Sequence, residues 1–247
     1  MFIPQTFSSY KQLINLIKCP ALISFIGAGG KTTTMFNLAS RYKKLSKKVL
    51  TTTTTKIMFP TEPNGCETYI FDASDNPRLL NKVKNGSITC IGQKPNFTKK
   101  KIIGIAPEYI NQIFAQKIFD VILVEADGAK QKPIKAPANH EPVIPQAATT
   151  VFGIIGTDAI GKKIEEKNVH RAEIFCQITS SKIGDIIDQN IITKLILSKN
   201  GLFTKTPNIC QKILLLNKTQ HANKTEQALN IANKIKEKAP NITTAII

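Results

Sequence analysis

The chain has 247 residues, of which 42% are hydrophobic and 21% charged, a composition that is typical of a globular protein and excludes a disordered tail. This length can bury a large core without disulfides or a structural metal, so we expect a single domain over residues 1–247. The net charge of +17 would suit a nucleic acid or an anionic membrane. However, only Arg41, Arg78 and Arg171 are arginines, and the lysines are scattered. We therefore predict a solvated lysine coat and no specific nucleic-acid partner.

The cysteines and the N-terminus indicate where the protein resides. The five cysteines lie far apart and form no CxxC pair, which argues against a disulfide framework and against a zinc ribbon. The N-terminus lacks the features of a signal peptide, and no uncharged apolar stretch approaches the length of a membrane span. We expect a cytoplasmic protein without a membrane partner.

The first elements predict a strand, a glycine-rich loop and a helix. Residues 21–26 form a continuous apolar run, which is typical of a central parallel strand. Residues 32–45 carry apolar side chains at helical spacing, and lysines gather near the end of this segment. A second short strand is predicted from Val49 through Thr51–Thr55, stopping near Lys56. This order is βαβ.

The remaining elements indicate the fold class. Turn signals at residues 63–65 and 85–86 alternate with short apolar pieces, so we interpret residues 60–117 as containing a small antiparallel insertion after the second strand. Strands are predicted at 119–124, 151–155 and 213–216, and helices at 107–118, 168–178, 190–197 and 224–238. This alternation predicts a three-layer α/β fold of the P-loop NTPase type, with a mainly parallel sheet and helices on both faces.

The glycine-rich loop, residues 27–30, predicts a nucleotide site because its pattern is GxxGKT between a strand and a helix. The usual longer pattern needs a glycine at position 25, where this chain has Phe25. Glycines let backbone N–H groups approach phosphate oxygens, the lysine adds a positive charge, and the first threonine offers a hydroxyl to Mg2+. We expect ATP or GTP with Mg2+. The predicted contacts are Gly27, Ala28, Gly29, Gly30, Lys31, Thr32 and Thr33.

Two acids follow the strand that ends at Glu125. Glu125 and Asp127 point to the same side if the strand continues. A phosphate loop requires an acid at the end of a neighbouring strand, so we predict that Thr32, Glu125 and Asp127 hold Mg2+. Lys31, Glu125 and Asp127 then form the catalytic set. The alternative is that the two acids only cap a turn, although a buried strand rarely delivers two carboxylates to one edge without a cation.

Two further segments are expected near the nucleotide. Thr55 and Lys56 would face the terminal phosphate if their strand ends beside the loop, although the threonine run is equally consistent with a purely structural role. Asn217 and Lys218 begin an NKTQ segment that resembles the guanine-reading NKxD pattern. Gln220 replaces the aspartate of that pattern, so the choice between ATP and GTP stays open.

A proline-rich segment, residues 133–145, directly follows the acids. It contains four prolines around Lys135, His140 and Glu141, which makes it rigid and non-helical. Such a segment beside a nucleotide site suits a substrate or partner, with Arg171 as a companion. The alternative is a plain connecting loop.

Together these segments resemble the YqeC family. The resemblance runs through most of the chain and rests on GAGGKTT at 27–33, the threonine run with Lys56, VEADGA at 124–129, KAPANHEPVIP at 135–145, VHR at 169–171 and LNK at 216–218. It implies a cytoplasmic P-loop protein that assists the maturation of a selenium-dependent molybdenum hydroxylase or its cofactor. It implies no established reaction.

Three functions fit these motifs. The first is Mg2+-dependent binding and hydrolysis of a nucleoside triphosphate that drives the maturation of such a hydroxylase. The second is a small-molecule kinase or ATP-dependent ligase, which would transfer phosphate to an acceptor. The third is a non-enzymatic protein that a bound nucleotide switches between two shapes. The sequence alone does not specify the acceptor or the oligomeric state.

Overall fold

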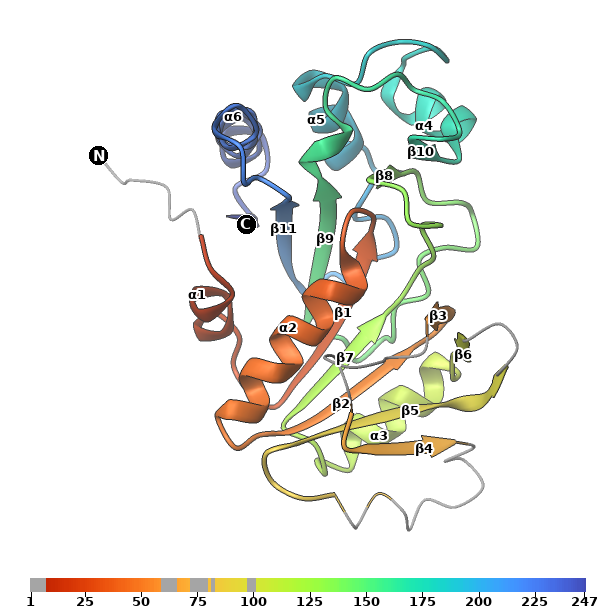
Figure 1. The fold of residues 1–247 in the computed structure, drawn as a ribbon, viewed down its shortest axis with the longest axis vertical. Helices are drawn as coiled ribbons and strands as arrows, with labels where there is room; N and C mark the ends of the chain where they lie inside the picture. Colours follow the sequence, from red (N-terminus) through yellow and green to blue (C-terminus); the bar gives the residue numbers. More distant parts are fainter. Residues whose placement is uncertain (1–7, 59–65, 72–79, 81–82, 97–100) are drawn as a thin grey trace.

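The computed structural model describes residues 8–58, 66–71, 80, 83–96 and 101–247. Its main feature is a ten-stranded sheet with the order β12-β11-β9-β1-β7-β2-β5-β6-β3, in which β4 also pairs with β5 (Figure 1). All pairs from β12 to β5, and the β4–β5 pair, are parallel. The strands are β1 (Ala21–Gly27), β2 (Lys48–Thr53), β3 (Lys56–Met58), β4 (Thr68–Phe71), β5 (Ser87–Asn96), β6 (Lys101–Ile103), β7 (Val121–Glu125), β9 (Thr150–Gly156), β11 (Gln211–Asn217) and β12 (Ile242–Ile246).

Helices cover both faces of this sheet. They are α1 (Tyr10–Asn15), α2 (Lys31–Lys44), α3 (Pro107–Ala115), α4 (Ala172–Thr179), α5 (Gln189–Leu197) and α6 (Ala222–Lys238). Successive side chains of a strand point to opposite faces, so each buried strand contributes side chains to the core on both faces of the sheet. Ile23 and Phe25 of β1 pack with α1 and α2, whereas Leu22 and Ile26 pack with α3 to α6. The predicted three-layer α/β fold with a mainly parallel sheet is confirmed.

The segment expected as an antiparallel insertion is antiparallel only in part. β6 pairs antiparallel with β3 and with β5, but β5 itself pairs in parallel with β2 and β4. The reason is burial: Ile88 and Ile91 of β5 are both buried, and they belong to the cores on opposite faces. The turn at residues 85–86 is confirmed, and the one at 63–65 lies outside the described residues.

Two predicted boundaries differ from the structure. β2 ends at Thr53, and residues 54 and 55 form a bend before β3 begins. The helix expected from residue 168 begins only at Ala172, because residues 169 and 170 form β10 (Val169–His170), which pairs with β8 (Ile134–Lys135). Arg171 between them has a φ of 66°, a left-handed conformation that separates strand from helix. The sequence patterns also missed α1, β8, β12 and the 3-10 helix η2 (Thr157–Ala159).

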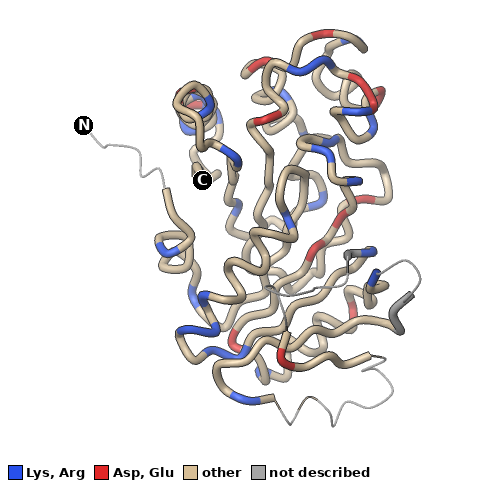
Figure 2. Tube along the Cα trace, viewed as in Figure 1, with Lys and Arg blue, Asp and Glu red and all other residues tan. Residues whose placement is uncertain are grey.

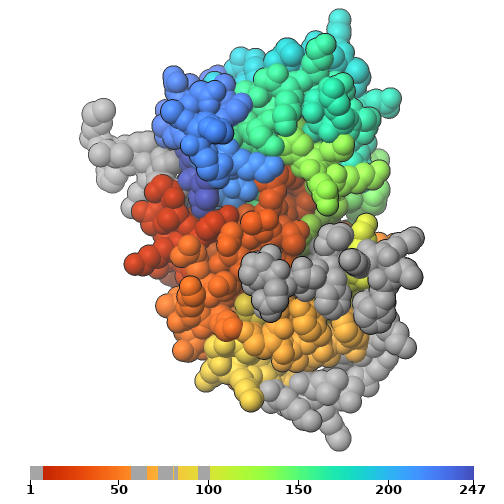
Figure 3. All heavy atoms as spheres, viewed as in Figure 1, coloured from red at the N-terminus to blue at the C-terminus, as the bar shows by residue number. Residues whose placement is uncertain are grey.

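Basic residues and sequence segments are distributed differently over the molecule. Lys and Arg are spread over most of the visible trace (Figure 2), as a solvated lysine coat requires. The segments of α4, α5 and α6 form one end of the molecule, and those of β4 and β5 the other (Figure 3). Among the described residues, no helix combines the length and apolarity needed to cross a bilayer.

Candidate functional site

The carboxyl ends of the parallel strands meet at one edge of the sheet, where α/β proteins bind ligands. The glycine-rich loop follows β1, and the acidic pair lies at the end of the adjacent strand β7. β2 ends on the other side of β7, and Asn217 ends β11, two strands from β1. The topology therefore brings four separate sequence segments to one edge.

The glycine-rich loop depends on backbone conformations and close approaches that side chains would block. Gly27, Gly29 and Gly30 have φ values of 90°, 87° and 126°. A Cβ on Gly29 would lie 2.2 Å from the backbone nitrogen of Gly156, and one on Gly30 would lie 2.3 Å from Nδ2 of Asn217. α2 starts at Lys31 without a side-chain cap, so its first N–H groups stay available. Free N–H groups at a helix N-terminus favour an anion.

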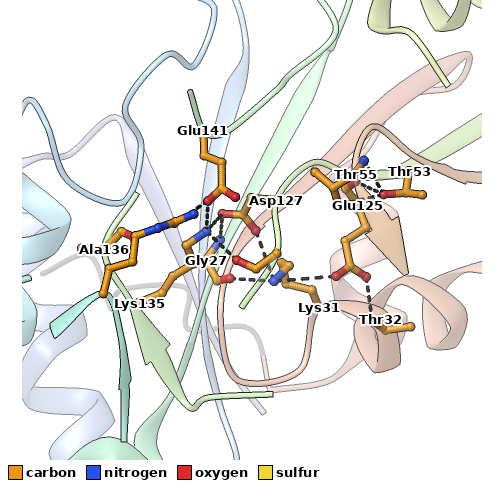
Figure 4. A network of polar contacts seen from close by, with 12 residues as sticks. Gly27, Lys31, Thr32, Thr53, Thr55, Glu125, Asp127, Lys135, Ala136 and Glu141 are labelled. Carbon is orange, nitrogen blue, oxygen red and sulfur yellow. Dashed lines mark hydrogen bonds and ion pairs between the residues drawn. The ribbon is translucent and has the colours of Figure 1, made fainter. Parts of the chain in front are cut away.

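The ammonium of Lys31 is folded back onto this loop (Figure 4). Its Nζ donates to the carbonyl oxygen of Gly27 at 2.7 Å and lies 3.2 Å from Oδ1 of Asp127 and 3.7 Å from Oε1 of Glu125. The residue is only 4% exposed. Burial opposes the charge, but the carboxylates of Asp127 and Glu125 outweigh it and raise the pKa of Lys31. A buried cation is thus held at the start of α2.

The two acids share Lys31 but have different surroundings. Oε2 of Glu125 accepts a hydrogen bond of 2.6 Å from Oγ1 of Thr32, whereas Oδ2 of Asp127 accepts one of 3.0 Å from the backbone N–H of Gly27. Burial is the main reason that the pKa of Glu125 is raised, and Lys31 partly opposes this. Glu125 therefore faces the threonine hydroxyl, while Asp127 anchors the loop backbone.

The oxygen donors of Thr32 and Glu125 fit a magnesium ion. A hydroxyl and a carboxylate lie side by side, and Mg2+ is usually bound by one or two carboxylates, with waters and substrate phosphates completing the shell. Within the described part of the chain, no group of three or more His, Cys, Asp and Glu side chains could hold a metal. Thr32 and Glu125 are therefore the residues here that could contribute to holding Mg2+.

Asp127 connects the loop to the proline-rich segment through Lys135. Nζ of Lys135 lies 3.0 Å from Oδ2 of Asp127, donates to Oε2 of Glu141 at 2.5 Å, and donates to the carbonyl oxygen of Gly128 at 2.7 Å (Figure 4). Lys135 is 2% exposed. Its ammonium is therefore enclosed between two carboxylates.

Arg171 completes this arrangement from the other side of Glu141. Its Nη1 donates to Oε2 of Glu141 at 2.6 Å and to the carbonyl oxygen of Ala136 at 3.3 Å. Burial would raise the pKa of Glu141, but the hydrogen bonds from Arg171 and Lys135 prevail and lower it to about 2. We call the connected set the ionic network. It comprises three cations and three carboxylates: Lys31, Lys135, Arg171, Glu125, Asp127 and Glu141.

A cavity of about 450 Å3 opens beside the glycine-rich loop, and we call it the loop cavity. Its walls include residues 29–33 and Glu125. Five further lysines line it: Lys56, Lys101, Lys130, Lys132 and Lys218. This is a strongly basic cavity at the point where the loop, the acids and α2 meet.

Comparison with known proteins places this sequence in a family. The family model for the YqeC protein matches residues 23–173. A protein of Escherichia coli (strain K12), described as uncharacterized protein YqeC, is 31% identical over 201 residues, which cover 81% of this chain and 77% of that protein. The chain belongs to the YqeC family. The family match contains the glycine-rich loop and the whole ionic network, but not Asn217.

The structure of this YqeC-family chain separates the predicted partner residues into two groups. Lys56 lines the loop cavity, whereas Thr55 does not and its hydroxyl lies 3.2 Å from that of Thr53. Lys135 and Glu141 belong to the ionic network behind the loop. His140 is apart from both groups: its side chain is 76% exposed, with Nε2 at 3.9 Å from Oε1 of Glu141. His140 is thus next to Glu141 in sequence but lies outside the ionic network.

Asn217 contacts the loop directly. Its Nδ2 donates to the carbonyl oxygen of Gly29 at 2.8 Å, and its Oδ1 accepts from the backbone N–H of Lys218 at 2.9 Å. Nζ of Lys218 in turn donates to Oδ2 of Asp158 at 3.0 Å. The sequence patterns did not indicate Asp158, nor the cavity lysines Lys101, Lys130 and Lys132. Only Lys130 and Lys132 had a usable signal, which was their position just after the acidic pair.

Proposed function

We propose that this YqeC-family protein binds a nucleoside triphosphate with Mg2+ in the loop cavity and hydrolyses it. The observation that carries the proposal is the position of Lys31. Its ammonium lies at the N-terminus of α2, against the carbonyl of Gly27 and beside the Thr32–Glu125 pair. A phosphate oxygen can replace the contacts that Lys31 makes with its own loop, because charge-assisted bonds to phosphate are strong.

Each residue then has a distinct role. The glycine-rich loop and the first N–H groups of α2 would bind the phosphates, and Lys31 would neutralise them. Thr32 and Glu125 would hold Mg2+, which when bound neutralises charge on the phosphates and orients them. Asp127 would keep the loop in place through the N–H of Gly27. Asn217 and Lys218 would face the base end, for either ATP or GTP.

The biological role is proposed from family membership. We infer that hydrolysis supports the maturation of a selenium- and molybdenum-dependent hydroxylase or its cofactor, which would be the partner. The ionic network supports such a coupling in one respect. It links the glycine-rich loop, through Asp127, Lys135 and Glu141, to the proline-rich segment, where a partner would sense a change at the loop.

Replacing Lys31 by alanine tests the site. We expect ATP or GTP with Mg2+ to bind at least tenfold more weakly to Lys31→Ala, because charge-assisted hydrogen bonds contribute about 1.5 to 3 kcal/mol and tenfold corresponds to about 1.4. Titration calorimetry measures this. Lys44→Ala, an exposed position at the other end of the same helix, is the matched control and should retain the affinity of the wild type. Equal affinities of both variants and the wild type would refute the site.

A small-molecule kinase or ATP-dependent ligase is the second candidate. The observation that favours it is the row of lysines in the loop cavity beyond Lys31, because a hydrolase needs only water on that side. The two candidates differ in their products. A kinase or ligase consumes little nucleotide until an acceptor is added, whereas a hydrolase releases inorganic phosphate without one.

A further inference from the structure

The ionic network and the cavity lysines are separate charge systems. Within the network, the three carboxylates contact the three cations, so its formal charges cancel. Lys218 is also compensated, because Oδ2 of Asp158 lies 3.0 Å from its Nζ. No carboxylate among the described residues pairs with Lys56, Lys101, Lys130 or Lys132. Considering the described residues alone, these four lysines bring four positive charges to the loop cavity without a paired carboxylate.

The phosphates of one nucleotide do not require all four of these lysine charges. A triphosphate bound to Mg2+ keeps a net charge of about −2, and its phosphates would already be served by Lys31 and the loop N–H groups. The positive charges of Lys56, Lys101, Lys130 and Lys132 then remain in the cavity. A phosphate monoester, which carries about −1.5 to −2 near neutral pH, would offset part of this charge.

The lysines also lie in the right place for a second ligand. The sheet order puts β11 on one side of β1 and the antiparallel pair β3–β6 on the other (Figure 1). Lys218 therefore lies on one flank of the glycine-rich loop, while Lys56 of β3 and Lys101 of β6 lie on the opposite flank. If the base occupies the side of Lys218, the terminal phosphate points towards Lys56 and Lys101.

The backbone between β7 and β8 adds an independent observation. Lys130 and Gln131 both line the loop cavity, and both have positive φ values, of 46° and 60°. Consecutive non-glycine residues in the left-handed region are unusual, and such strain concentrates at ligand-binding sites. The Lys130 segment thus lines the same cavity as Lys56 and Lys101.

We propose that Lys56, Lys101 and Lys130 form a second anion subsite, which binds the phosphate group of a phosphorylated co-substrate next to the terminal phosphate of the nucleotide. This inference rests on the proposed nucleotide site and specifies the class of the second substrate: a molecule that carries a phosphate monoester. Lys132 is left out because its Nζ donates to the carbonyl oxygen of Lys167 at 2.9 Å and is held at the rim.

In the test, the protein is first saturated with Mg2+ and a non-hydrolysable nucleotide analogue, and calorimetry measures the binding of the analogue. Glycerol 3-phosphate is then titrated into the complex and its binding is measured by 31P line broadening, with glycerol and inorganic phosphate in parallel. We expect saturable binding of the monoester and none of glycerol. In Lys56→Gln/Lys101→Gln/Lys130→Gln, monoester binding should weaken at least tenfold, while analogue affinity should fall by less than threefold.

A triple variant with the same charge loss elsewhere is the control. Lys182, Lys199 and Lys236 are exposed residues that do not line the loop cavity, and Lys182→Gln/Lys199→Gln/Lys236→Gln should bind the monoester as the wild type does. No monoester binding to the wild-type complex, binding of inorganic phosphate alone, or equal weakening of analogue and monoester in the first variant would each overturn the subsite. Failure of the analogue itself to bind would instead refute the nucleotide site.

Discussion

At the residue scale, two carboxylates that look alike in sequence differ in the structure. Glu125 borders the loop cavity and accepts a hydrogen bond from the hydroxyl of Thr32. Asp127, by contrast, is 2% exposed and lies between the ammonium groups of Lys31 and Lys135. Burial raises the pKa of Glu125 although Lys31 partly opposes this, so a further cation beside this carboxylate would be favourable. We therefore propose that Glu125 holds the metal ion and that Asp127 maintains the conformation of the loop.

Substitution separates these two roles. We expect Glu125→Gln to lose the effect of Mg2+ on nucleotide affinity while its unfolding free energy stays close to that of the wild type. Asp127→Asn should lose about 3 to 5 kcal/mol of unfolding free energy, because it removes the negative charge that two buried cations, Lys31 and Lys135, share. Urea unfolding and titrations with and without Mg2+ measure the two effects. The assignment is reversed if Asp127→Asn is stable and alone loses the dependence on Mg2+.

The sequence indicated candidate site residues most directly where one segment carries the whole signal. Residues 27–33 specify the loop because the glycines, Lys31 and Thr32 are neighbours in sequence. Lys101 and Asp158 could not be found in this way, because each reaches the site only through strand pairing or a distant contact. The roles of His140 and Glu141 were not separable either, since only burial distinguishes an exposed imidazole from a carboxylate that two cations enclose.

At the element scale, the glycine-rich loop is defined by close approach as well as by backbone conformation. Gly29 and Gly161 have the same φ of 87°, but a Cβ would meet the backbone of Gly156 at the first position and nothing within 4 Å at the second. A comparison of Gly29 with Gly161 therefore separates the effect of close approach from the effect of backbone conformation. The left-handed conformation alone costs roughly 1 to 2 kcal/mol for a residue with a side chain.

We predict that Gly29→Ala abolishes nucleotide binding, because the loop must move away from Gly156 to accommodate the methyl group. Gly161→Ala should lower the unfolding free energy by about 1 to 2 kcal/mol and leave nucleotide affinity unchanged. Thermal melting combined with calorimetry checks both. Nucleotide binding by Gly29→Ala at wild-type strength would show that the loop tolerates the displacement and that its glycines are conformational only.

Sequence patterns predicted most of the elements but not every pairing. Long apolar runs such as β1, β7 and β9 were evident because they are buried on both faces. β12 was missed because Thr243 and Thr244 interrupt its short apolar pattern at the edge of the sheet. The parallel pairing of β5 with β2 was missed because the intervening segment carries turn signals that suit a local hairpin equally well.

At the scale of the whole molecule, the ionic network makes stability depend on pH. The pKa of Glu141 is lowered to about 2 from an ordinary value of 4.5. A carboxyl whose pKa is lower in the folded state stabilises the fold above its unfolded pKa and loses this contribution as the pH falls. The relevant window therefore extends from about pH 4.5 down to about pH 2.

We predict that Glu141→Gln unfolds more easily than the wild type at pH 7, by about 1 to 3 kcal/mol after allowance for solvent screening. This difference should shrink as the pH falls from about 4.5 to about 2, because the wild-type carboxyl becomes protonated. Urea unfolding at a series of pH values measures it. His140→Ala, which removes an exposed neighbour, serves as the control and should match the wild type throughout. A difference between Glu141→Gln and the wild type that is independent of pH would contradict this account.

The strand order also has a consequence for how the protein is made. β1 pairs with β7 and β9, which follow it by about 100 residues or more, and Asn217 of β11 holds the carbonyl of Gly29. A chain emerging from the ribosome therefore exposes its loop sequence long before the strands that flank it exist, and such distant pairings form slowly. We expect nascent chains that end before β11 to be incompetent for nucleotide capture. The chain would acquire its ligand only after β11 has been synthesised.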